Sequence, residues 1–282
     1  MKSIFRVASP AIVAPLRHQH GPTATKIGNS LAVVTVAAAA AAATATYASE
    51  SSHCEPTKQY TNYYFPVPGT GEPTRILLML SGLDWGDVII TGKEWPALKP
   101  TTKWGQMPVV KLADGREMTQ TKAICRYFAK NVSIDGLKLY PSDPWIAFQV
   151  DEFIDTFDDI NTKMASTFSI KDAKERAAAR AAMFATNGTG VIFECFKKVE
   201  AQLPGDGHMV NGTFTLADVW AFYQVNLFRA GFLDGFPTEG WLEKLPKLKG
   251  IVDKVAAQPK IKGYYSAKAK ESKIYTAHAS GK

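Results

Sequence analysis

The spacing of Tyr64 and Glu72 constrains the fold of this chain more than any other feature. Residues 64–75 read Tyr-Phe-Pro-Val-Pro-Gly-Thr-Gly-Glu-Pro-Thr-Arg. A β-prone segment ends at Tyr64, a loop rich in Pro and Gly follows, and Pro73 suits the first turn of a helix. This layout predicts a strand, a loop and a helix in which a phenol faces a small ligand near the start of the helix.

Patterns after the tyrosine predict an α/β domain followed by an all-helical domain, with the boundary between residues 136 and 137. Apolar periodicity and turn residues predict strands at 60–65, 87–91, 107–112 and 116–118, with helices at 72–81 and 121–131. This order is that of a thioredoxin-like domain over residues 59–136. Residues 137–282 lack strand signals after Tyr140, and helices are predicted at 144–167, 171–203, 215–230 and 241–257.

The predicted helix at 215–230 begins with a recognisable start signal. Thr215 is followed three residues later by Asp218, the spacing of a capping box in which each residue bonds to the backbone of the other. We interpret this pair as a folding signal and not as catalytic.

The first 58 residues differ from the remainder in composition. Residues 1–30 are basic and contain no acid, which is typical of an organelle transit peptide. Residues 31–49 are Ala-rich and uncharged, and as a helix they would span about 29 Å, close to a bilayer core. Residues 50–58 resemble a linker. Three interpretations stay open: a transit peptide with a membrane anchor, a wholly cleaved targeting segment, or a disordered extension.

Composition excludes several function classes. The net charge is +7, but residues 1–49 carry +4 of it, so the rest is too weakly basic to predict nucleic-acid binding. The three cysteines, Cys54, Cys125 and Cys195, are far apart, and the five histidines are scattered. No spacing typical of a zinc or redox site occurs, and we expect no metal.

Four motifs in order resemble the glutathione transferases of the sigma-like, tyrosine-type classes. They are the segment from Tyr64 to Arg75, Trp-Pro-Ala-Leu-Lys at 95–99, Gly-Gln-Met-Pro at 105–108, and Gln-Thr-Lys-Ala-Ile at 120–124. The resemblance extends over residues 60–265. It implies a thioredoxin-like domain that binds glutathione as co-substrate, followed by an all-helical domain.

The resemblance also implies a catalytic role for Tyr64, which lies eight positions before Glu72 as in the family. Glutathione reacts as its thiolate, and a thiol has an ordinary pKa of about 8.5. A phenol that donates a hydrogen bond to sulfur favours the thiolate and lowers that pKa. The alternative is that Tyr64 only packs in its strand.

Seven further residues are implied to hold glutathione. A cis bond before Pro108 would present the backbone of Met107 to the cysteinyl part, and the helix start at Thr121 would bind the γ-glutamyl carboxylate. Trp95 and Lys99 would bind the glycyl end of glutathione. The implied binding residues are Trp95, Lys99, Gln106, Met107, Pro108, Gln120 and Thr121. Read without the resemblance, Thr121 is a helix cap and Lys99 a solvated lysine.

Acidic residues follow one face of the helix predicted at 144–167. Asp151, Asp155 and Asp158 are spaced by four and three residues, so their like charges repel and need an offsetting partner. In the resembled class this helix lines a dimer interface, and the resemblance implies that Asp159 reaches the glutathione amine of the partner subunit. The alternative is a solvated acidic face.

The chain departs from the family pattern in the loop after Tyr64. The family has an arginine two positions before the Glu, where this chain has Thr70. Two functions therefore stay open. One is conjugation or isomerisation of an apolar electrophile by a homodimer. The other is a weak or inactive scaffold subunit of a membrane complex. The N-terminal segment favours a mitochondrial location at the inner membrane, against another organelle membrane or a soluble, cleaved form.

Overall fold

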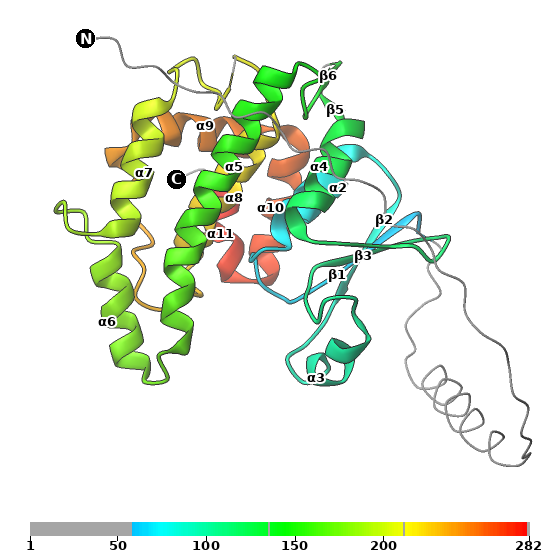
Figure 1. The fold of residues 1–282 in the computed structure, drawn as a ribbon, viewed down its shortest axis with the longest axis horizontal. Coiled ribbons are helices and arrows are strands. Elements are labelled where there is room, and N and C mark those ends of the chain that lie inside the picture. The colour runs from blue at the N-terminus through cyan, green and yellow to red at the C-terminus, as the bar shows by residue number, and fades with distance from the viewer. Residues whose placement is uncertain (1–57, 135, 211, 281–282) are drawn as a thin grey trace, which may run out of the picture. The chain divides into compact units, whose positions relative to one another are not determined.

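The computed structural model describes residues 58–134, 136–210 and 212–280. The predictions made for residues 1–57, including the transit-like segment and the Ala-rich segment, lie outside this range. Among the described residues, no helix combines the length and the apolar character needed to cross a membrane. The described chain forms a mixed sheet followed by a helical half (Figure 1).

The sheet contains four strands in the order β2-β1-β3-β4. Strand β1 lies in the middle, parallel to β2 and antiparallel to β3, and β4 pairs antiparallel with β3. The apolar residues Val109 and Val110 at the start of β3 are buried, as expected for an inner strand. The strands are β1 (Tyr60–Tyr64), β2 (Trp85–Ile89), β3 (Val109–Leu112) and β4 (Glu117–Thr119).

Two helices of this half have the predicted bounds. Helix α2 (Glu72–Ser81) has Pro73 in its first turn and ends at Gly82, whose φ of 70° is a conformation that glycine adopts freely. Helix α4 (Thr121–Asn131) packs against α2. The short helix α3 (Trp95–Leu98) follows β2, and a small hairpin of β5 (Ser133–Ile134) and β6 (Leu137–Lys138) closes the half.

The helical half is organised around α8 (Leu216–Arg229), whose fourteen residues are all buried. The predicted capping box at Thr215 and Asp218 is present. Helix α8 packs against α5 and α9 and, from the sheet half, against α2 and α4. The other helices are α5 (Pro144–Ala165), α6 (Ala173–Met183), α7 (Val191–Gln202), α9 (Pro246–Ala257), α10 (Pro259–Glu271) and α11 (Thr276–Ser280).

The prediction of one helix over residues 171–203 is wrong. The chain leaves the helical path at Phe184 and resumes it at Val191. Phe184 is buried among other aromatic rings, including Trp241 at 4.9 Å between centroids. Gly188 has a φ of 93°, and a Cβ on Gly190 would lie 2.4 Å from the backbone of Ala185, so the connecting loop needs glycine at both positions.

The last predicted helix, 241–257, is shorter than expected. A 3-10 turn covers Leu242–Lys244, and α9 begins at Pro246 because proline fits the first helical turn. The helices α10 and α11 were not predicted. Their sequence has a weak apolar periodicity, with Ile261 and Tyr265 as the buried residues of α10.

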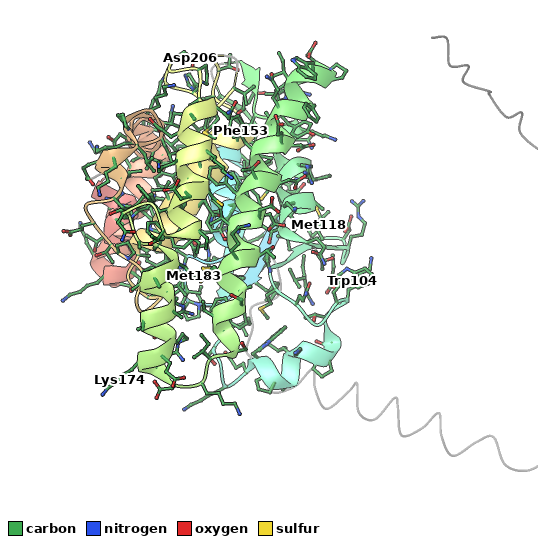
Figure 2. The ribbon with its side chains drawn as sticks, turned by 60° about the vertical axis from the view of Figure 1, so that its left-hand side comes forward. Trp104, Met118, Phe153, Lys174, Met183 and Asp206 are labelled. Atoms are coloured by element: carbon green, nitrogen blue, oxygen red, sulfur yellow. The ribbon has the colours of Figure 1, made fainter. Side chains whose placement is uncertain are left out.

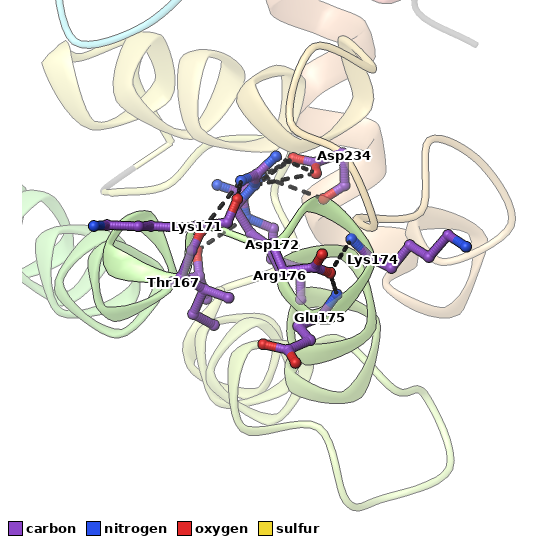
Figure 3. Close-up of polar contacts among 9 residues, drawn as sticks. Thr167, Lys171, Asp172, Lys174, Glu175, Arg176 and Asp234 are labelled. Atoms are coloured by element: carbon purple, nitrogen blue, oxygen red, sulfur yellow. Dashed lines mark hydrogen bonds and ion pairs between the residues drawn. The ribbon is translucent and has the colours of Figure 1, made fainter.

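A compact turn after α8 depends on Gly235. Its φ is 86°, and a Cβ there would lie 2.2 Å from the carbonyl oxygen of Ala177 in α6. The adjacent Asp234 binds Arg176 of α6, with 3.0 Å between Oδ2 and Nη2 (Figure 3). It also contacts Arg180. The turn is therefore held against α6 by close backbone approach and by charge.

We expect Gly235→Ala to destabilise the protein through two effects. The left-handed φ costs about 1–2 kcal/mol for a residue with a Cβ. The backbone contact adds about 1–3 kcal/mol for overpacking. Gly115→Ala is a matched control, because Gly115 has the same φ of 86° with no atom within 4 Å of an added Cβ. Urea unfolding of both variants measures the difference, and equal losses would show that the contact with Ala177 is unimportant.

Candidate functional site

Five of the predicted binding residues line one cavity of about 330 Å³, which we call the thioredoxin-side cavity. They come from the loop before β3 and from the start of α4, which are distant in sequence. Pro108 follows a cis peptide bond, as predicted. The lining residues are Thr70, Trp104, Gln106, Met107, Pro108, Thr119, Gln120 and Thr121.

A second cavity of about 370 Å³ adjoins the first and lies between the two halves. We call it the interdomain cavity. It shares Thr70, Gln120 and Thr121 with the thioredoxin-side cavity, so these residues lie where the two meet. Its other lining residues come from α4, α5 and α8, namely Lys122, Ala123, Arg126, Asp158, Asn161, Trp220 and Tyr223.

Tyr64 lies behind this junction. Its side chain is 5% exposed, and it is not among the residues that line either cavity. Its hydroxyl is 3.0 Å from the hydroxyl of Thr70, which lines both. The sequence predicts that the Tyr64 phenol faces the ligand groove directly. In the structure the phenol instead contacts the hydroxyl of Thr70, and it is Thr70 that lines the cavities.

The loop after Tyr64 packs directly on the tyrosine ring. A Cβ on Gly71 would lie 2.4 Å from Cγ of Tyr64, and a Cβ on Gly69 would lie 2.6 Å from its hydroxyl oxygen. Only glycine permits such approach. Burial raises the pKa of Tyr64, although bonds with Thr70 and Gly71 and the charge of Arg75 act in the opposite direction. Tyr64 is therefore a neutral phenol at physiological pH.

Arg75 holds this loop in place. The side chain is buried, lies over the Tyr64 ring at 5.3 Å from the centroid, and donates to the backbone carbonyls of Phe65 and Val67. It pairs with Glu72 at 3.0 Å and with Asp87 at 2.9 Å. Burial alone lowers the pKa of Arg75, but these two carboxylates raise it above its ordinary value.

The start of α4 can hold an anion. Its first backbone N–H groups have no side-chain cap, which differs from the reading of Thr121 as a simple cap. The preceding residue, Gln120, has a φ of 71°, an uncommon conformation for a residue with a side chain. The amide of Gln120 donates to the amide oxygen of Gln106 at 3.3 Å. Free N–H groups at a helix start favour a carboxylate or phosphate.

The acidic face of α5 is neutralised by α4. Lys122 binds Asp155 at 2.8 Å and Asp158 at 3.0 Å, and Arg126 binds Asp151 at 2.8 Å. Partial burial lowers the pKa of Lys122, but the two aspartates raise it above its ordinary value. These are the offsetting partners that the acidic spacing required. They also tie the start of α4 to the helical half.

Two buried polar groups in the wall of the interdomain cavity have no partner among the described residues. They are the indole N–H of Trp220 and the hydroxyl of Tyr223, both on α8. Buried polar atoms in proteins are nearly always satisfied, but these two atoms are closed off from solvent, so a bound molecule reaches them only when the cavity wall adjusts. Burial raises the pKa of Tyr223 well above its ordinary value, which keeps it a hydrogen-bond donor.

Comparison with known proteins identifies the family. Residues 158–268 match the family model described as glutathione S-transferase, C-terminal domain. The chain is 36% identical over 210 residues to the glutathione S-transferase of Anopheles gambiae, covering 73% of this chain and 94% of that protein. It is 33% identical to glutathione S-transferase S1 of Drosophila melanogaster, with coverage of 74% and 79%. The chain belongs to the glutathione S-transferase family.

Solved structures agree with this assignment. The prostaglandin synthase D of Nilaparvata lugens superimposes with a TM-score of 0.62 at 28% identity, covering 74% of this chain and 97% of that one. The rat hPGDS complexed with a quinoline gives 0.61 at 25% identity, with coverage of 74% and 96%. The chain thus has the fold of this family, whose members use glutathione as co-substrate.

Three predicted residues lie apart from the two cavities. Trp95 is half-buried and packs edge-on against Phe65, with ring centroids 5.5 Å apart. Lys99 is exposed near Gly105 on the loop that leads to the thioredoxin-side cavity. Asp159 is exposed on α5, next to the cavity-lining Asp158. Its predicted contact involves a second subunit, so it stays a prediction.

The sequence did not point to Thr70, Arg75, Trp220 or Tyr223. In the sequence Thr70 stands out only as a departure from the family pattern, and its hydroxyl between Gly69 and Gly71 is the available signal. The described residues contain no cluster of three or more His, Cys, Asp or Glu suited to a metal ion. Burial raises the pKa of Cys125 to about 12, so its thiol is protonated and unreactive.

Proposed function

We propose that this protein is a sigma-like glutathione transferase that activates the glutathione thiol through the hydroxyls of Tyr64 and Thr70. The observation that carries the proposal is the 3.0 Å contact between those hydroxyls, together with the position of Thr70 at the junction of the two cavities. Glutathione occupies the thioredoxin-side cavity, and an apolar electrophile occupies the interdomain cavity.

In this mechanism Tyr64 acts as a donor and not as a base, because burial keeps its phenol protonated. The phenol donates to the Thr70 oxygen, which leaves the threonine proton free to point at the sulfur. A hydroxyl that donates to sulfur favours the thiolate and lowers the pKa of the thiol. The helix start at Thr121 holds the γ-glutamyl carboxylate, and the Met107 backbone pairs with the cysteinyl part.

The electrophile would be held by its acceptor atoms. Trp220 and Tyr223 have an unpaired N–H and an unpaired O–H just behind the cavity wall, which an acceptor atom would reach when the wall adjusts. A carbonyl, nitro or peroxide oxygen satisfies both without a charge. The structural similarity to the prostaglandin synthase D of Nilaparvata lugens supports isomerisation as well as conjugation.

Substitutions of Thr70 test this proposal directly. We expect Thr70→Val to lower kcat/KM with a chromogenic aryl halide by about 10²-fold, because one donor in the transition state is lost. Thr70→Ser is the matched control, since it retains the hydroxyl and should stay within a few-fold of wild type. The pH profile of Thr70→Val should move toward the free thiol pKa of about 8.5.

Tyr64→Phe separates the two hydroxyls. We expect a smaller loss than in Thr70→Val, since Thr70 keeps its own proton, and both variants should still be retained on immobilised glutathione. If Thr70→Val has wild-type kcat/KM and Tyr64→Phe does not, the phenol acts on sulfur by itself and the role of Thr70 is refuted.

The alternative function is a glutathione-binding scaffold with little turnover. The burial of Tyr64 behind the loop favours it, since the family's usual catalytic group is covered. Wild-type protein that binds immobilised glutathione but does not conjugate aryl halides would support the scaffold. Protein that neither binds nor turns over would exclude both functions.

We further propose a homodimer. Large aromatic side chains are exposed on the loop before β3 and on α5. Trp104 is 57% exposed (Figure 2), and Trp145 is 66% exposed and stacked on Phe148 at 5.2 Å. Exposed apolar patches mark interaction surfaces. Light scattering of wild type and Trp145→Glu tests this, because a monomer in both cases contradicts it.

The cellular location is also a proposal, carried by the sequence of the N-terminal segment alone. A mitochondrial inner-membrane anchor predicts that the protein stays in the pellet after carbonate extraction, with residues 31–49 still attached. N-terminal sequencing of the mature protein distinguishes an anchored form from a cleaved one.

A further inference from the structure

A third cavity lies in the helical half and is lined by other residues than the proposed glutathione site. Its volume is about 540 Å³, and it shares no lining residue with the thioredoxin-side or interdomain cavities. It is formed by the end of α8, the segment 238–243 and the residues around the start of α11. Cavities of this size suit small organic ligands.

Arg229 contributes a buried, unpaired cation to this cavity. Its side chain is only 7% exposed at the last position of α8. It makes one hydrogen bond within the described chain, from Nη1 to the amide oxygen of Asn226 at 3.3 Å, and no ion pair. Arginine carries five N–H donors, and buried charges in proteins are usually paired. Most of the donors of Arg229 are therefore unused.

A second buried donor lines the same cavity. The indole N–H of Trp241 has no partner among the described residues, although the side chain is 1% exposed. Lys273 lines the opening as a second cation without an ion pair in the described chain. The lining thus offers the unused N–H groups of Arg229 and one exposed cation, Lys273, while the Trp241 N–H lies closed off behind the cavity surface.

We propose that this cavity binds an organic monocarboxylate. The carboxylate would take paired hydrogen bonds from the Arg229 guanidinium, while Leu242 and Ala277 contact the apolar body. The exposed carboxylates of Glu239 and Glu243 also line the opening, and their repulsion is weaker for a monoanion than for a doubly charged phosphate. This ligand pairs with the guanidinium N–H groups of Arg229 that the folded chain leaves unused.

The proposal is independent of glutathione chemistry and is tested on the full-length protein by calorimetric titration. The probe is 1-naphthoate, and 1-naphthalenemethanol is its uncharged analogue. Titrations are repeated with S-hexylglutathione at saturation, which occupies the glutathione and electrophile sites. We expect naphthoate to bind equally with and without S-hexylglutathione, at least 10-fold more tightly than the alcohol.

Arg229→Gln and Lys273→Gln separate the two cations. We expect Arg229→Gln to weaken naphthoate at least 10-fold, and Lys273→Gln to weaken it by a smaller factor that disappears at high salt. Retention on immobilised glutathione shows whether each variant folds. If Arg229→Gln fails to fold, the comparison of 1-naphthoate with 1-naphthalenemethanol on the wild-type protein still tests the proposal.

Three results would overturn the site. They are displacement of naphthoate by S-hexylglutathione, equal affinity for acid and alcohol, or unchanged affinity in Arg229→Gln. Loss of glutathione binding in wild type would refute the proposed function and leave this site standing, since the two readouts are separate.

Discussion

Replacing Arg75 with alanine is expected to lower the free energy of unfolding by about 3–5 kcal/mol. Arg75 is buried between Glu72 and Asp87, and its removal leaves the fully buried Glu72 carboxylate without its counter-ion. An unpaired buried charge is far more destabilising than the intact pair is stabilising. The loop carbonyls of Phe65 and Val67 lose their donors as well.

Urea unfolding of two further variants identifies the cause. Adding Glu72→Gln to Arg75→Ala removes the stranded charge and should recover part of the loss. Arg116→Ala is the surface control, because Arg116 and its partner Asp114 are exposed, and we expect no measurable change. A loss in Arg75→Ala no larger than in Arg116→Ala would show that the network does not stabilise the fold.

The second large effect is the pH dependence caused by His278. This side chain is fully buried in α11, stacked on Tyr265 at 4.8 Å, and neither ring nitrogen has a partner in the described chain. Burial, aided by the charge of Arg229, lowers the pKa of His278 to about 3. The unfolded chain has an ordinary histidine pKa of about 6.5.

The direction in which stability changes with pH follows from proton uptake. As the pH falls below about 6.5, the imidazole of residue 278 binds a proton in the unfolded state but not in the folded state. The folded state therefore loses stability. The loss grows by about 1.4 kcal/mol per pH unit until the folded pKa near 3 is reached or α11 detaches locally. Above about pH 6.5 this contribution is constant.

His278→Leu measures the effect, because leucine fills the site without titrating. We expect the difference in unfolding free energy between His278→Leu and wild type to widen by about 2 kcal/mol between about pH 7 and about pH 5. At neutral pH the variant should be at least as stable, since two unpaired nitrogens are removed. Parallel pH curves for the two proteins would refute a neutral, buried histidine.

Helices with local start and stop signals could be predicted from sequence to the residue. Helix α2 has Pro73 at its start and Gly82 after its end, and α4 follows a β-hairpin that ends at Thr119. The break at Phe184 could not be predicted in this way. It depends on aromatic partners from α7, α8 and residue 241, which are distant in sequence. Gly188 and Gly190 are the local signal of this break.

The candidate site could be predicted from sequence where a short motif fixes the local backbone conformation. Gln106, Met107, Pro108, Gln120 and Thr121 lie together because the β3–β4 hairpin brings their two segments side by side. The arrangement around Tyr64 was not predictable, because it depends on the path of a glycine-containing loop across the ring and on the reach of Arg75. Unpaired groups such as those of Trp220 and Arg229 are defined only by the absence of partners in three dimensions.

The bond between Tyr265 and Glu72 has a consequence for biosynthesis. The Tyr265 hydroxyl donates to the buried Glu72 carboxylate at 2.7 Å, across 193 residues of chain. Tyr265 is made 193 residues after Glu72, at about 5–20 residues per second. Until then the Glu72 carboxylate has its ion pair with Arg75 but lacks the Tyr265 donor, so the thioredoxin-like half completes its buried polar network only when α10 has been made.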